Sequence, residues 1–293
     1  MTPQGAKAWA LRAGLQLRYS VDLERLAAVA APFVQLALDD AGAAYIGAAE
    51  ARRHGIVTTW LHRRLRAVFS DFDVNGLLGT YPMHVLSTAQ WRTLLSLAGH
   101  PTDRSLGRIL DVGAGRGDVT AQLAPLFESV VVSETSRPMA RRLRRLGYPC
   151  LQGDIVAQNQ LRGEHVDLQH SFDVVSLLNV LDRCDRPLSL LAAARGALRP
   201  GGLLLVALVL PYRPFVYERG GPRAPLERLA ISSETFEQAA AEFATITLQP
   251  LGLEVLALSR VPYLSGGDAQ APLYELDDLI AVCRAQDSLP LID

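Results

Sequence analysis

The chain has 293 residues, 49% of them hydrophobic, and a formal net charge of −1 at pH 7. This composition suits a globular protein with a substantial core, and the balanced charge argues against a surface devoted to nucleic acid. Three widely spaced cysteines fit neither a disulfide framework nor a zinc site, and no apolar run is long enough to span a bilayer. No clear signal-peptide core is visible, so the location stays open. The cytoplasm is the default expectation, and the secretory pathway is the alternative if an N-terminal segment is missing.

We divide the chain into a helical N-terminal region, residues 1–100, and an α/β domain, residues 101–293. Apolar residues at helical spacing predict helices in the first region, over residues 21–31, 33–49, 57–69 and 87–97. Ser87 is a suitable N-cap for the last helix, and the glycines of residues 75–79 indicate a turn. We expect this region either to cover a ligand site from one side or to serve as a packing appendage.

A glycine-rich turn opens the second region. An apolar strand over residues 108–112 breaks at Gly113, Gly115 and Gly117, and a helix is expected over residues 119–127. Glycines let a backbone approach a ligand closely, and the start of a helix offers N–H donors and a positive dipole end. The spacing G-x-G-x-G lacks the final glycine of the dinucleotide fingerprint. The turn is therefore either a site for S-adenosylmethionine (SAM), which we favour, or an ordinary tight strand–helix connection.

Strands and helices alternate after this turn. Strands are expected over residues 130–133, 150–153, 172–178 and 203–210, and helices over residues 137–146 and 188–198. Farther on, a helix is expected over residues 233–244, strands over 253–260 and 276–283, and loops or turns over 155–171, 218–224 and 261–268. The alternation predicts a Rossmann-like, doubly wound parallel sheet.

Polar residues end the successive strands, where such sheets bind their ligands. Asp111 would repel a pyrophosphate but suits a cationic amino-acid ligand. Glu134 lies roughly 20 residues after the glycine turn, where ribose-binding carboxylates fall. Asp154 and Asn179 complete the row. We expect Asp111, the turn glycines, Glu134, Asp154 and Asn179 to bind the cofactor.

Asn179 and Asp182 form the second chemical signal. They leave the same strand end three residues apart, so in a helix or turn they face the same side. A carboxylate there could accept an N–H of a nitrogen nucleophile and stabilise positive charge as that nitrogen is alkylated. The alternative is that Asp182 caps the next helix and pairs with Arg183 or Arg186.

The sequence resembles the DREV family, which comprises methyltransferase-like protein 9 and its relatives. The similarity extends over about residues 70–270. It is carried by Asn75-Gly76-Leu77-Leu78-Gly79, Leu110-Asp111-Val112-Gly113-Ala114-Gly115, Leu178-Asn179-Val180-Leu181-Asp182-Arg183-Cys184-Asp185, Ala207-Leu208-Val209-Leu210-Pro211 and Pro262-Tyr263-Leu264. The resemblance implies a class I SAM-dependent fold and methylation of protein histidine at the Nπ (pros) nitrogen, within His-x-His motifs where x is small.

The resemblance also implies roles for single residues. Asn179 and Asp182 match residues that bind the substrate histidine, Tyr263 matches an active-site tyrosine, and Glu134 matches the cofactor site together with the glycine turn. This sequence departs from the family where Arg116 replaces an acidic residue, where Asp154 replaces Asn, and in a longer loop over residues 155–171. These departures affect the expected cofactor contacts and the shape of the substrate groove.

The predicted reaction is a direct SN2 transfer in which a neutral imidazole nitrogen attacks the methyl group of SAM and S-adenosylhomocysteine leaves. Histidine is half neutral near pH ~6.5, so no strong base is needed. We assign Asp182 to the other ring nitrogen, with Asn179 and Tyr263 orienting the ring; the alternative for Tyr263 is a core aromatic. Two other functions stay open: methylation of a small molecule, and binding without catalysis.

The expected partners are proteins or peptides with alternating histidines. Nucleic acid is not expected, because residues 179–182 read Asn-Val-Leu-Asp instead of the Asn/Asp-Pro-Pro-aromatic run of many nucleic-acid amino-methylating enzymes. No membrane span is expected, and the chain is expected to be a monomer. No metal is expected either, since His165 and His170 fit a solvated loop better than a metal site.

Overall fold

The computed structural model describes residues 7–8, 17–26, 29–51, 82–100, 104–163, 168–218, 221–267 and 271–286. The expected helix over residues 57–69, the turn at Asn75 to Gly79, and His165 lie outside the described residues.

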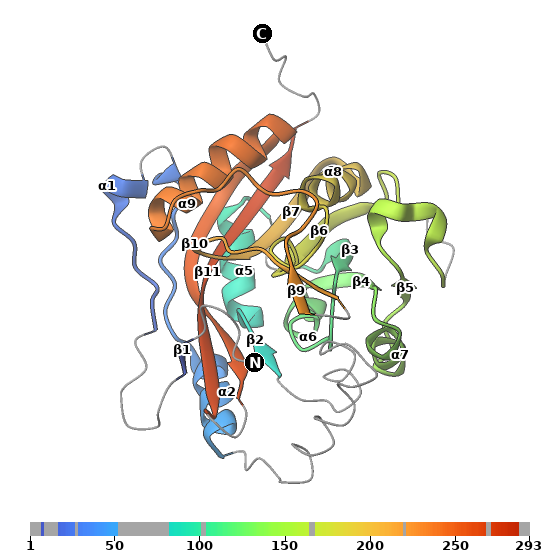
Figure 1. Cartoon of the computed structure of the whole chain (residues 1–293), viewed down its shortest axis with the longest axis horizontal. Helices are drawn as coiled ribbons and strands as arrows, with labels where there is room; N and C mark the ends of the chain where they lie inside the picture. Colours follow the sequence, from blue (N-terminus) through green and yellow to red (C-terminus); the bar gives the residue numbers. More distant parts are fainter. Residues whose placement is uncertain are drawn as a thin grey trace.

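A large mixed sheet forms the centre of the molecule (Figure 1). In the described part of the chain its strand order is β2-β10-β11-β7-β6-β3-β4-β5, and β1 pairs with β11. The strands are β1 (Lys7–Ala8), β2 (Met83–His84), β3 (Leu106–Val112), β4 (Phe127–Glu134), β5 (Cys150–Gln152), β6 (Phe172–Leu178), β7 (Leu198–Val209), β10 (Leu253–Gly266) and β11 (Leu273–Ala285). A separate hairpin is made by β8 (Val216–Glu218) and β9 (Gly221–Arg223).

Five neighbouring strands, β7, β6, β3, β4 and β5, run parallel, as the alternation of strands and helices predicts. The chain then adds two antiparallel strands beyond β7, because β11 pairs with β7 and β10 pairs with β11. This arrangement brings the carboxyl ends of the parallel strands to one edge, where the expected ligand residues lie. The predicted doubly wound α/β fold is confirmed.

Helices cover both faces of the sheet (Figure 1). The helices are α1 (Leu23–Leu26), α2 (Asp40–Ala51), α5 (Thr88–Leu97), α6 (Thr120–Leu123), α7 (Arg137–Arg145), α8 (Pro187–Ala197) and α9 (Phe236–Glu242). A π-helix, Phe243–Leu248, continues α9, and short 3-10 helices follow α6, β5 and the π-helix, at Ala124–Leu126, Ile155–Gln160 and Gln249–Leu251. Ser87 caps α5 through a reciprocal pair of hydrogen bonds with Gln90, as expected.

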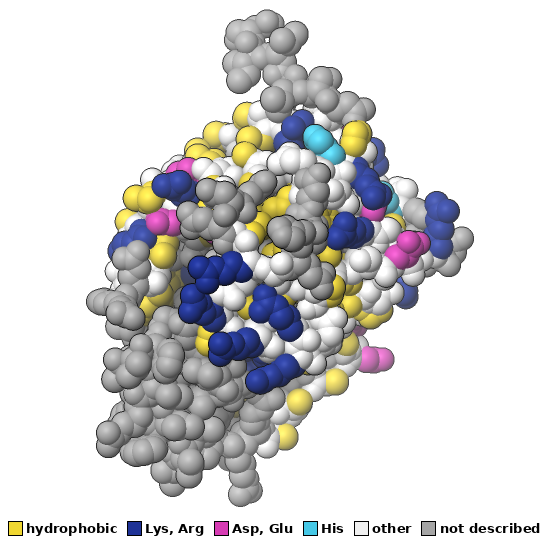
Figure 2. Space-filling model, turned by 90° about the vertical axis from the view of Figure 1, so that its right-hand side faces the viewer, with side chains coloured by type: hydrophobic (Ala, Val, Ile, Leu, Met, Phe, Trp, Pro, Cys, Tyr) yellow, Lys and Arg dark blue, Asp and Glu magenta, His cyan; other side chains and the backbone are white. Residues whose placement is uncertain are grey.

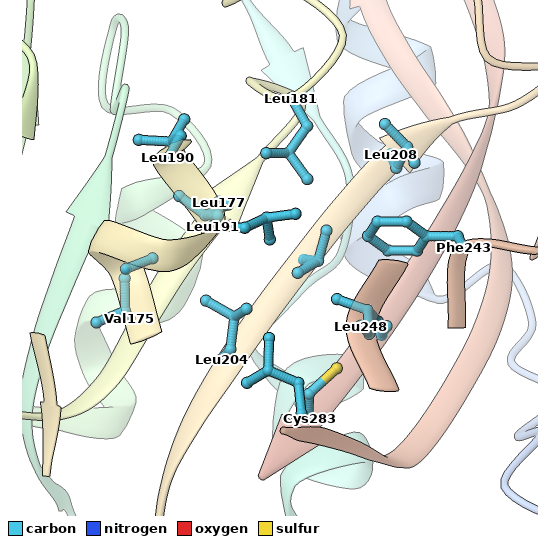
Figure 3. Close-up of a cluster of buried hydrophobic side chains, with 14 of the residues drawn as sticks. Val175, Leu177, Leu181, Leu190, Leu191, Leu204, Leu208, Phe243, Leu248 and Cys283 are labelled. Carbon is cyan, nitrogen blue, oxygen red and sulfur yellow. The ribbon is translucent and has the colours of Figure 1, made fainter. Parts of the chain in front are cut away.

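The core forms because side chains of a strand alternate between the two faces of the sheet. Between Leu203 and Leu208, strand β7 is buried on both sides and therefore reads as an unbroken apolar run. Its side chains divide between two clusters, with Leu204, Val206 and Leu208 under α8 and α9 and Leu203, Leu205 and Ala207 under α5. Figure 3 shows the first cluster, where Leu191 of α8 and Phe243 after α9 gather around β7. Each fully buried leucine contributes about 1.5–3 kcal/mol.

Several expected boundaries are wrong because long-range strand pairing overrides the local signal. The turn expected over residues 261–268 is the continuation of β10, whose residues pair with β11 as far as Gly266. The loop expected over residues 218–224 holds the β8–β9 hairpin. Residues 33–39 are not helical, since Phe33 bridges to Leu258 of β10 and the helix begins only at Asp40.

Two further expectations need correction. The loop over residues 155–171 begins with a 3-10 helix and buries Ile155 and Leu168 almost completely, so part of it belongs to the core. The helix expected over residues 119–127 is a single α-turn followed by a 3-10 turn, because Phe127 already begins β4. The expected division into a helical region and an α/β domain stays a prediction.

Candidate active site

The glycine turn after β3 takes a backbone that only glycine adopts without strain. Gly113, Gly115 and Gly117 have φ values of 69°, 54° and 84°, in the left-handed region that a Cβ disfavours. A Cβ on Gly113 would lie 2.5 Å from Cγ1 of Val180. The turn therefore packs directly against the segment that carries Asn179 and Asp182.

The backbone N–H groups of this turn are engaged within the chain. Gly113 donates to Ser133 O over 2.9 Å, and Gly117 donates to Ala114 O over 2.9 Å. Gly115 donates to Oε2 of Glu134 over 2.9 Å. The glycines thus serve close packing and turn geometry, and the expected row of free N–H donors is absent at these three positions.

Asp111 lies beneath the turn, 3% exposed. Its two oxygens accept hydrogen bonds from hydroxyl groups, Oδ2 from Thr120 over 2.6 Å and Oδ1 from Ser176 over 2.7 Å. Burial raises the pKa of its carboxyl, and the two hydroxyl donors oppose that shift. In this structure Asp111 joins β3, β6 and α6, and its direct contact with the cofactor stays a prediction.

Glu134 and Asp154 both lie at the expected edge of the sheet, in different surroundings. Glu134 is buried, and besides Gly115 it accepts a hydrogen bond from the backbone N–H of Ser136 over 2.8 Å. Burial raises the pKa of its carboxyl. Asp154 is exposed and accepts from the N–H of Val156 over 2.9 Å. Glu134 thus links the glycine turn to the start of α7, and its carboxylate is held where the fold expects a ribose.

Asn179 follows β6 in a left-handed conformation, with φ at 58°, which asparagine tolerates better than most residues. Its backbone N–H donates to Ala207 O of β7 over 2.9 Å. Its side-chain Nδ2 donates to Oδ2 of Asp278 over 2.8 Å, whereas its Oδ1 is buried without a partner. The strained backbone and the free oxygen are both typical of a functional position.

Asp182 is not a helix cap. Helix α8 begins five residues later, and its N-cap position is Arg186, whose side chain makes no cap hydrogen bond. Asp182 is 2% exposed; its Oδ2 pairs with Nη1 of Arg183 at 2.5 Å, and its Oδ1 has no partner. Burial raises the pKa of its carboxyl to about 6, against the attraction of Arg183. The pairing with Arg183 is confirmed, and the capping alternative is wrong.

Tyr263 lies on β10 beside this segment. Its hydroxyl donates to Sδ of Met83, the first residue of β2, which pairs with β10. Burial raises the pKa of its hydroxyl, and the nearby Asp278 and Asp182 add to the shift. Met83 also lies near the glycine turn, since a Cβ on Gly115 would be 3.8 Å from its Cε. Strand β2 thus connects the N-terminal region to both halves of the site.

Asp278 is the residue of this site that the sequence reading missed. It lies on β11, fully buried, and it holds the Asn179 amide through Oδ2 while its Oδ1 has no partner. Burial raises the pKa of its carboxyl well above the ordinary value, and Asp182 adds to the shift. The signal was present: Asp277 and Asp278 interrupt the otherwise apolar run over residues 276–283, and buried acids are rare unless they are paired or functional.

Asn179, Asp182 and Asp278 thus leave three buried oxygen atoms without a hydrogen-bond partner in the described structure. Such atoms are uncommon in native proteins and call for a donor. The residues present fit SAM, whose ammonium and sulfonium groups are cationic: glycines shape the turn, Glu134 stands at the ribose position, and acceptors lie beside it. The residues predicted to hold it remain Asp111, Gly113, Gly115, Gly117, Glu134, Asp154 and Asn179.

Helix α7 places positive charge next to the glycine turn. It has five arginines and three buried apolar residues in its sequence RPMARRLRR, without an acid. Arg137, Arg141, Arg144 and Arg145 are exposed, and the Nε of Arg142 donates to Arg116 O of the turn over 3.1 Å. Figure 2 shows arginine side chains gathered on the face to which α7 belongs. The protein therefore has a positively charged face although its net charge is near zero.

The described residues show neither a membrane-spanning helix nor a metal-binding cluster. Within those ranges, no helix combines the length and the apolar character that a bilayer crossing needs. The described histidines, cysteines and acids form no group of three or more that could hold a metal ion. His170, one of the two loop histidines, bonds through Nδ1 to Leu198 O at 2.9 Å.

A curated protein is similar to part of this chain. A malonyl-[acyl-carrier protein] O-methyltransferase from Chlorobium phaeovibrioides is 36% identical over 137 residues, which are 43% of this chain and 50% of that protein. The chain thus spans half the length of this curated relative.

Solved structures show distant likeness. The N-methyltransferase NodS from Bradyrhizobium japonicum, in complex with S-adenosylhomocysteine, is 18% identical, with a TM-score of 0.40 over 67% of this chain and 86% of that one. The YcgJ protein from Bacillus subtilis is 11% identical, with a TM-score of 0.41 over 63% of this chain and 94% of that one.

A family model extends over most of the chain. The model of the DREV methyltransferases matches residues 18–285, which include the glycine turn, the Asn179–Asp182 segment and both antiparallel strands of the sheet. The extent of this match identifies the family and with it the cofactor, and the strand order agrees with the fold. The chain belongs to the DREV methyltransferase family and has the class I SAM-dependent methyltransferase fold.

Proposed function

We propose that this methyltransferase transfers the methyl group of SAM to the Nπ nitrogen of histidine, within His-x-His motifs of proteins. The family resemblance of Asn179, Asp182 and Tyr263 suggests this substrate. The observation that carries the proposal is the pair of buried oxygens, Asn179 Oδ1 and Asp182 Oδ1, that lack a hydrogen-bond donor. A neutral imidazole has one N–H to donate and one bare nitrogen to act as the nucleophile.

The charge of the site fits a nucleophile that becomes positive. When bound, SAM supplies an electrophilic methyl group on a sulfonium centre. Asp182, with a pKa of about 6, is mainly ionised at neutral pH, so its carboxylate accepts the N–H of the ring and stabilises the imidazolium as it forms. Arg183 stacks on Phe215 at 4.0 Å and pairs with Oδ2 of Asp182, which leaves Oδ1 for the ring.

The similarity to a malonyl-carrier O-methyltransferase favours a second candidate, methylation of a carboxylate. A carboxylate substrate is an acceptor and an anion. It would meet the free oxygens of Asn179, Asp182 and Asp278, with Arg183 already paired to Asp182. Acceptors facing an anion in a buried site are unfavourable. We therefore rank this candidate second.

Mass spectrometry of a peptide tests the proposal. A His-Ala-His peptide, incubated with SAM and the protein, should gain a methyl group, and chromatography after hydrolysis should identify it as Nπ-methylhistidine. An Ala-Ala-Ala version of the same peptide and the Asp182→Asn variant are the matched controls. Methylation of the free carboxylate of a malonyl thioester, without methylation of the peptide, would favour the second candidate. Binding of SAM without any transfer would favour a binding function.

A further inference from the structure

The buried carboxyl of Asp278 has a geometry that ties it to Asn179. The side chain is fully buried on β11, and it lies 99 residues after Asn179 in the sequence. It accepts from Asn179 Nδ2 over 2.8 Å. Asp182, Asp277 and Arg183 are the charged groups that act on it. No arginine or lysine is hydrogen-bonded to it among the described residues, so the carboxyl is not the partner of an ion pair there.

The hydrogen bond decides which end of the Asn179 amide faces the ligand. An amide presents two donors on nitrogen and two lone pairs on oxygen, and a half-turn about its last bond exchanges them. Oδ2 of Asp278 is an acceptor, so it holds the nitrogen and turns the oxygen away from β11. That oxygen is the buried Asn179 Oδ1 without a partner. Without Asp278, the amide could present N–H groups where the ligand needs an acceptor.

We propose that Asp278 is a positioning residue, which locks the Asn179 amide so that its oxygen accepts an N–H of the bound substrate. The proposal rests on the proposed function for the identity of that N–H, an imidazole. The bond does not depend on charge, because a protonated carboxyl can still accept through its carbonyl oxygen.

A double-mutant cycle on turnover tests the coupling. If Asp278 acts through Asn179, then Asp278→Ala and Asn179→Ala should each lower kcat about tenfold or more, and the double variant should be no slower than Asn179→Ala alone. Asp278→Asn should restore most of the turnover that Asp278→Ala loses, since its amide oxygen can accept the same bond. Thermal unfolding shows that each variant is folded, and binding of S-adenosylhomocysteine shows that the Asp278 variants keep the cofactor site.

The neighbouring residue supplies the matched control. Asp277 precedes Asp278 on β11 and pairs with Arg260, so Asp277→Ala perturbs the same strand away from Asn179. Its effect on kcat should multiply with that of Asn179→Ala. If the effects of Asp278→Ala and Asn179→Ala also multiply, Asp278 acts independently of Asn179 and the proposal is wrong.

Nuclear magnetic resonance of the full-length protein without substrate gives a readout besides activity. The side-chain NH₂ signals of Asn179, assigned by their loss in Asn179→Ala, should shift and broaden in Asp278→Ala and stay near their wild-type positions in Asp278→Asn. Unchanged signals in Asp278→Ala would overturn the proposal. The two failures are distinguishable: a protein that methylates no histidine peptide but shows these shifts retains the Asp278 inference and loses the proposed function.

Discussion

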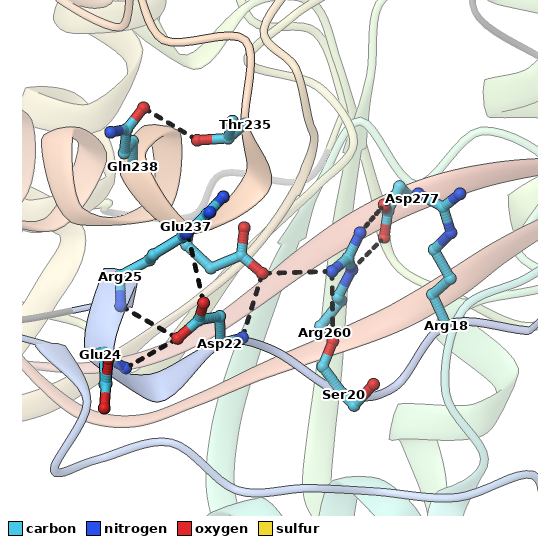
Figure 4. Close-up of polar contacts among 10 residues, drawn as sticks. All are labelled: Arg18, Ser20, Asp22, Glu24, Arg25, Thr235, Glu237, Gln238, Arg260 and Asp277. Atoms are coloured by element: carbon cyan, nitrogen blue, oxygen red, sulfur yellow. Dashed lines mark hydrogen bonds and ion pairs between the residues drawn. The ribbon is translucent and has the colours of Figure 1, made fainter.

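Asp277 and Asp278 are consecutive residues of one strand, yet their carboxylates have opposite surroundings. Asp277 accepts two hydrogen bonds from Arg260, from Nε over 2.9 Å and from Nη2 over 2.5 Å, and Arg260 also reaches Glu237 (Figure 4). Asp278 is more deeply buried and receives one neutral amide N–H. Because strand side chains alternate between faces, one residue step separates a satisfied ion pair from an unsatisfied acid.

The two adjacent residues therefore differ in role: the carboxylate of Asp277 is structural, and that of Asp278 belongs to the candidate site. The Arg260 cluster joins α9, β10, β11 and the segment before α1, since Arg260 also donates to Ser20 O and lies over the ring of Phe236 at 4.4 Å. All its charges are paired, as buried charges are in a structural role. Asn179, Asp182 and Asp278 together leave three buried oxygens without a partner. Buried acceptors without a donor lower stability, and such a cost is expected where a ligand supplies the missing donor.

The largest expected effect concerns Asp182, the carboxylate nearest the proposed chemistry. Asp182→Asn keeps the size and loses the charge that stabilises an imidazolium. Turnover should fall about 10²–10⁴-fold, the range for a positioned acid or base, while affinity for S-adenosylhomocysteine stays near the wild-type value. Single-turnover rates with one peptide measure this. Near-equal rates in the two proteins would show that Asp182 is structural.

Arg260 tests the satisfied side of the comparison. Arg260→Ala leaves Asp277 and Glu237 without their cation, and stability should fall by about 3 kcal/mol, the lower end for one partner of a buried ion pair, because Asp277 keeps some access to water. Urea unfolding measures the change. Arg18→Ala is the control: that arginine is 51% exposed and lies 3.9 Å from Asp277, so its loss should cost less than about 1 kcal/mol. Equal losses would refute the assignment of Arg260 as the structural hub.

Glu134 combines both kinds of role, because it binds the turn and stands at the expected ribose position. Glu134→Ala should weaken SAM binding by about 1–3 kcal/mol, the value of hydrogen bonds to a charged group. Calorimetry measures it, and Glu134→Gln, which keeps one carbonyl acceptor for Gly115, should lose less. Unchanged affinity in Glu134→Ala would remove this residue from the cofactor site.

The sequence predicted the parallel half of the sheet well, because apolar strands ending in polar residues are a local pattern. It predicted less of the antiparallel half. The run Pro262-Tyr263-Leu264 carries turn-forming neighbours, and only the distant β11 makes it a strand. The pattern around Phe33 likewise predicts a helix, whereas the segment bridges to Leu258, more than two hundred residues away.

The residues of the candidate site could likewise be predicted only where a local pattern marks them. Asn179, Asp182, Glu134 and the glycines could be found because each lies at the end of a recognisable strand or matches the family. Asp278 could not be placed beside Asn179, since the contact depends on β11 pairing with β7. The reason for glycine at Gly113 was also hidden, because its nearest neighbour is the side chain of Val180. These contacts depend on tertiary packing.

The smallest expected effect tests the comparison directly, through the pH dependence of stability. Burial raises the pKa of Asp278 in the native state above its value in the unfolded chain. Ionisation then favours the unfolded chain, so the wild-type protein loses stability from this group as pH rises above about 4. Asp278→Asn cannot ionise and should be more stable than wild type at neutral pH, by up to about 2 kcal/mol, with the gain shrinking toward pH 4. Asp277→Asn should instead lose about 1–2 kcal/mol, since it weakens the charged bonds from Arg260. Urea unfolding at several pH values measures both, and a stability difference for Asp278→Asn that does not grow with pH would show that burial does not disfavour the ionised carboxyl of Asp278.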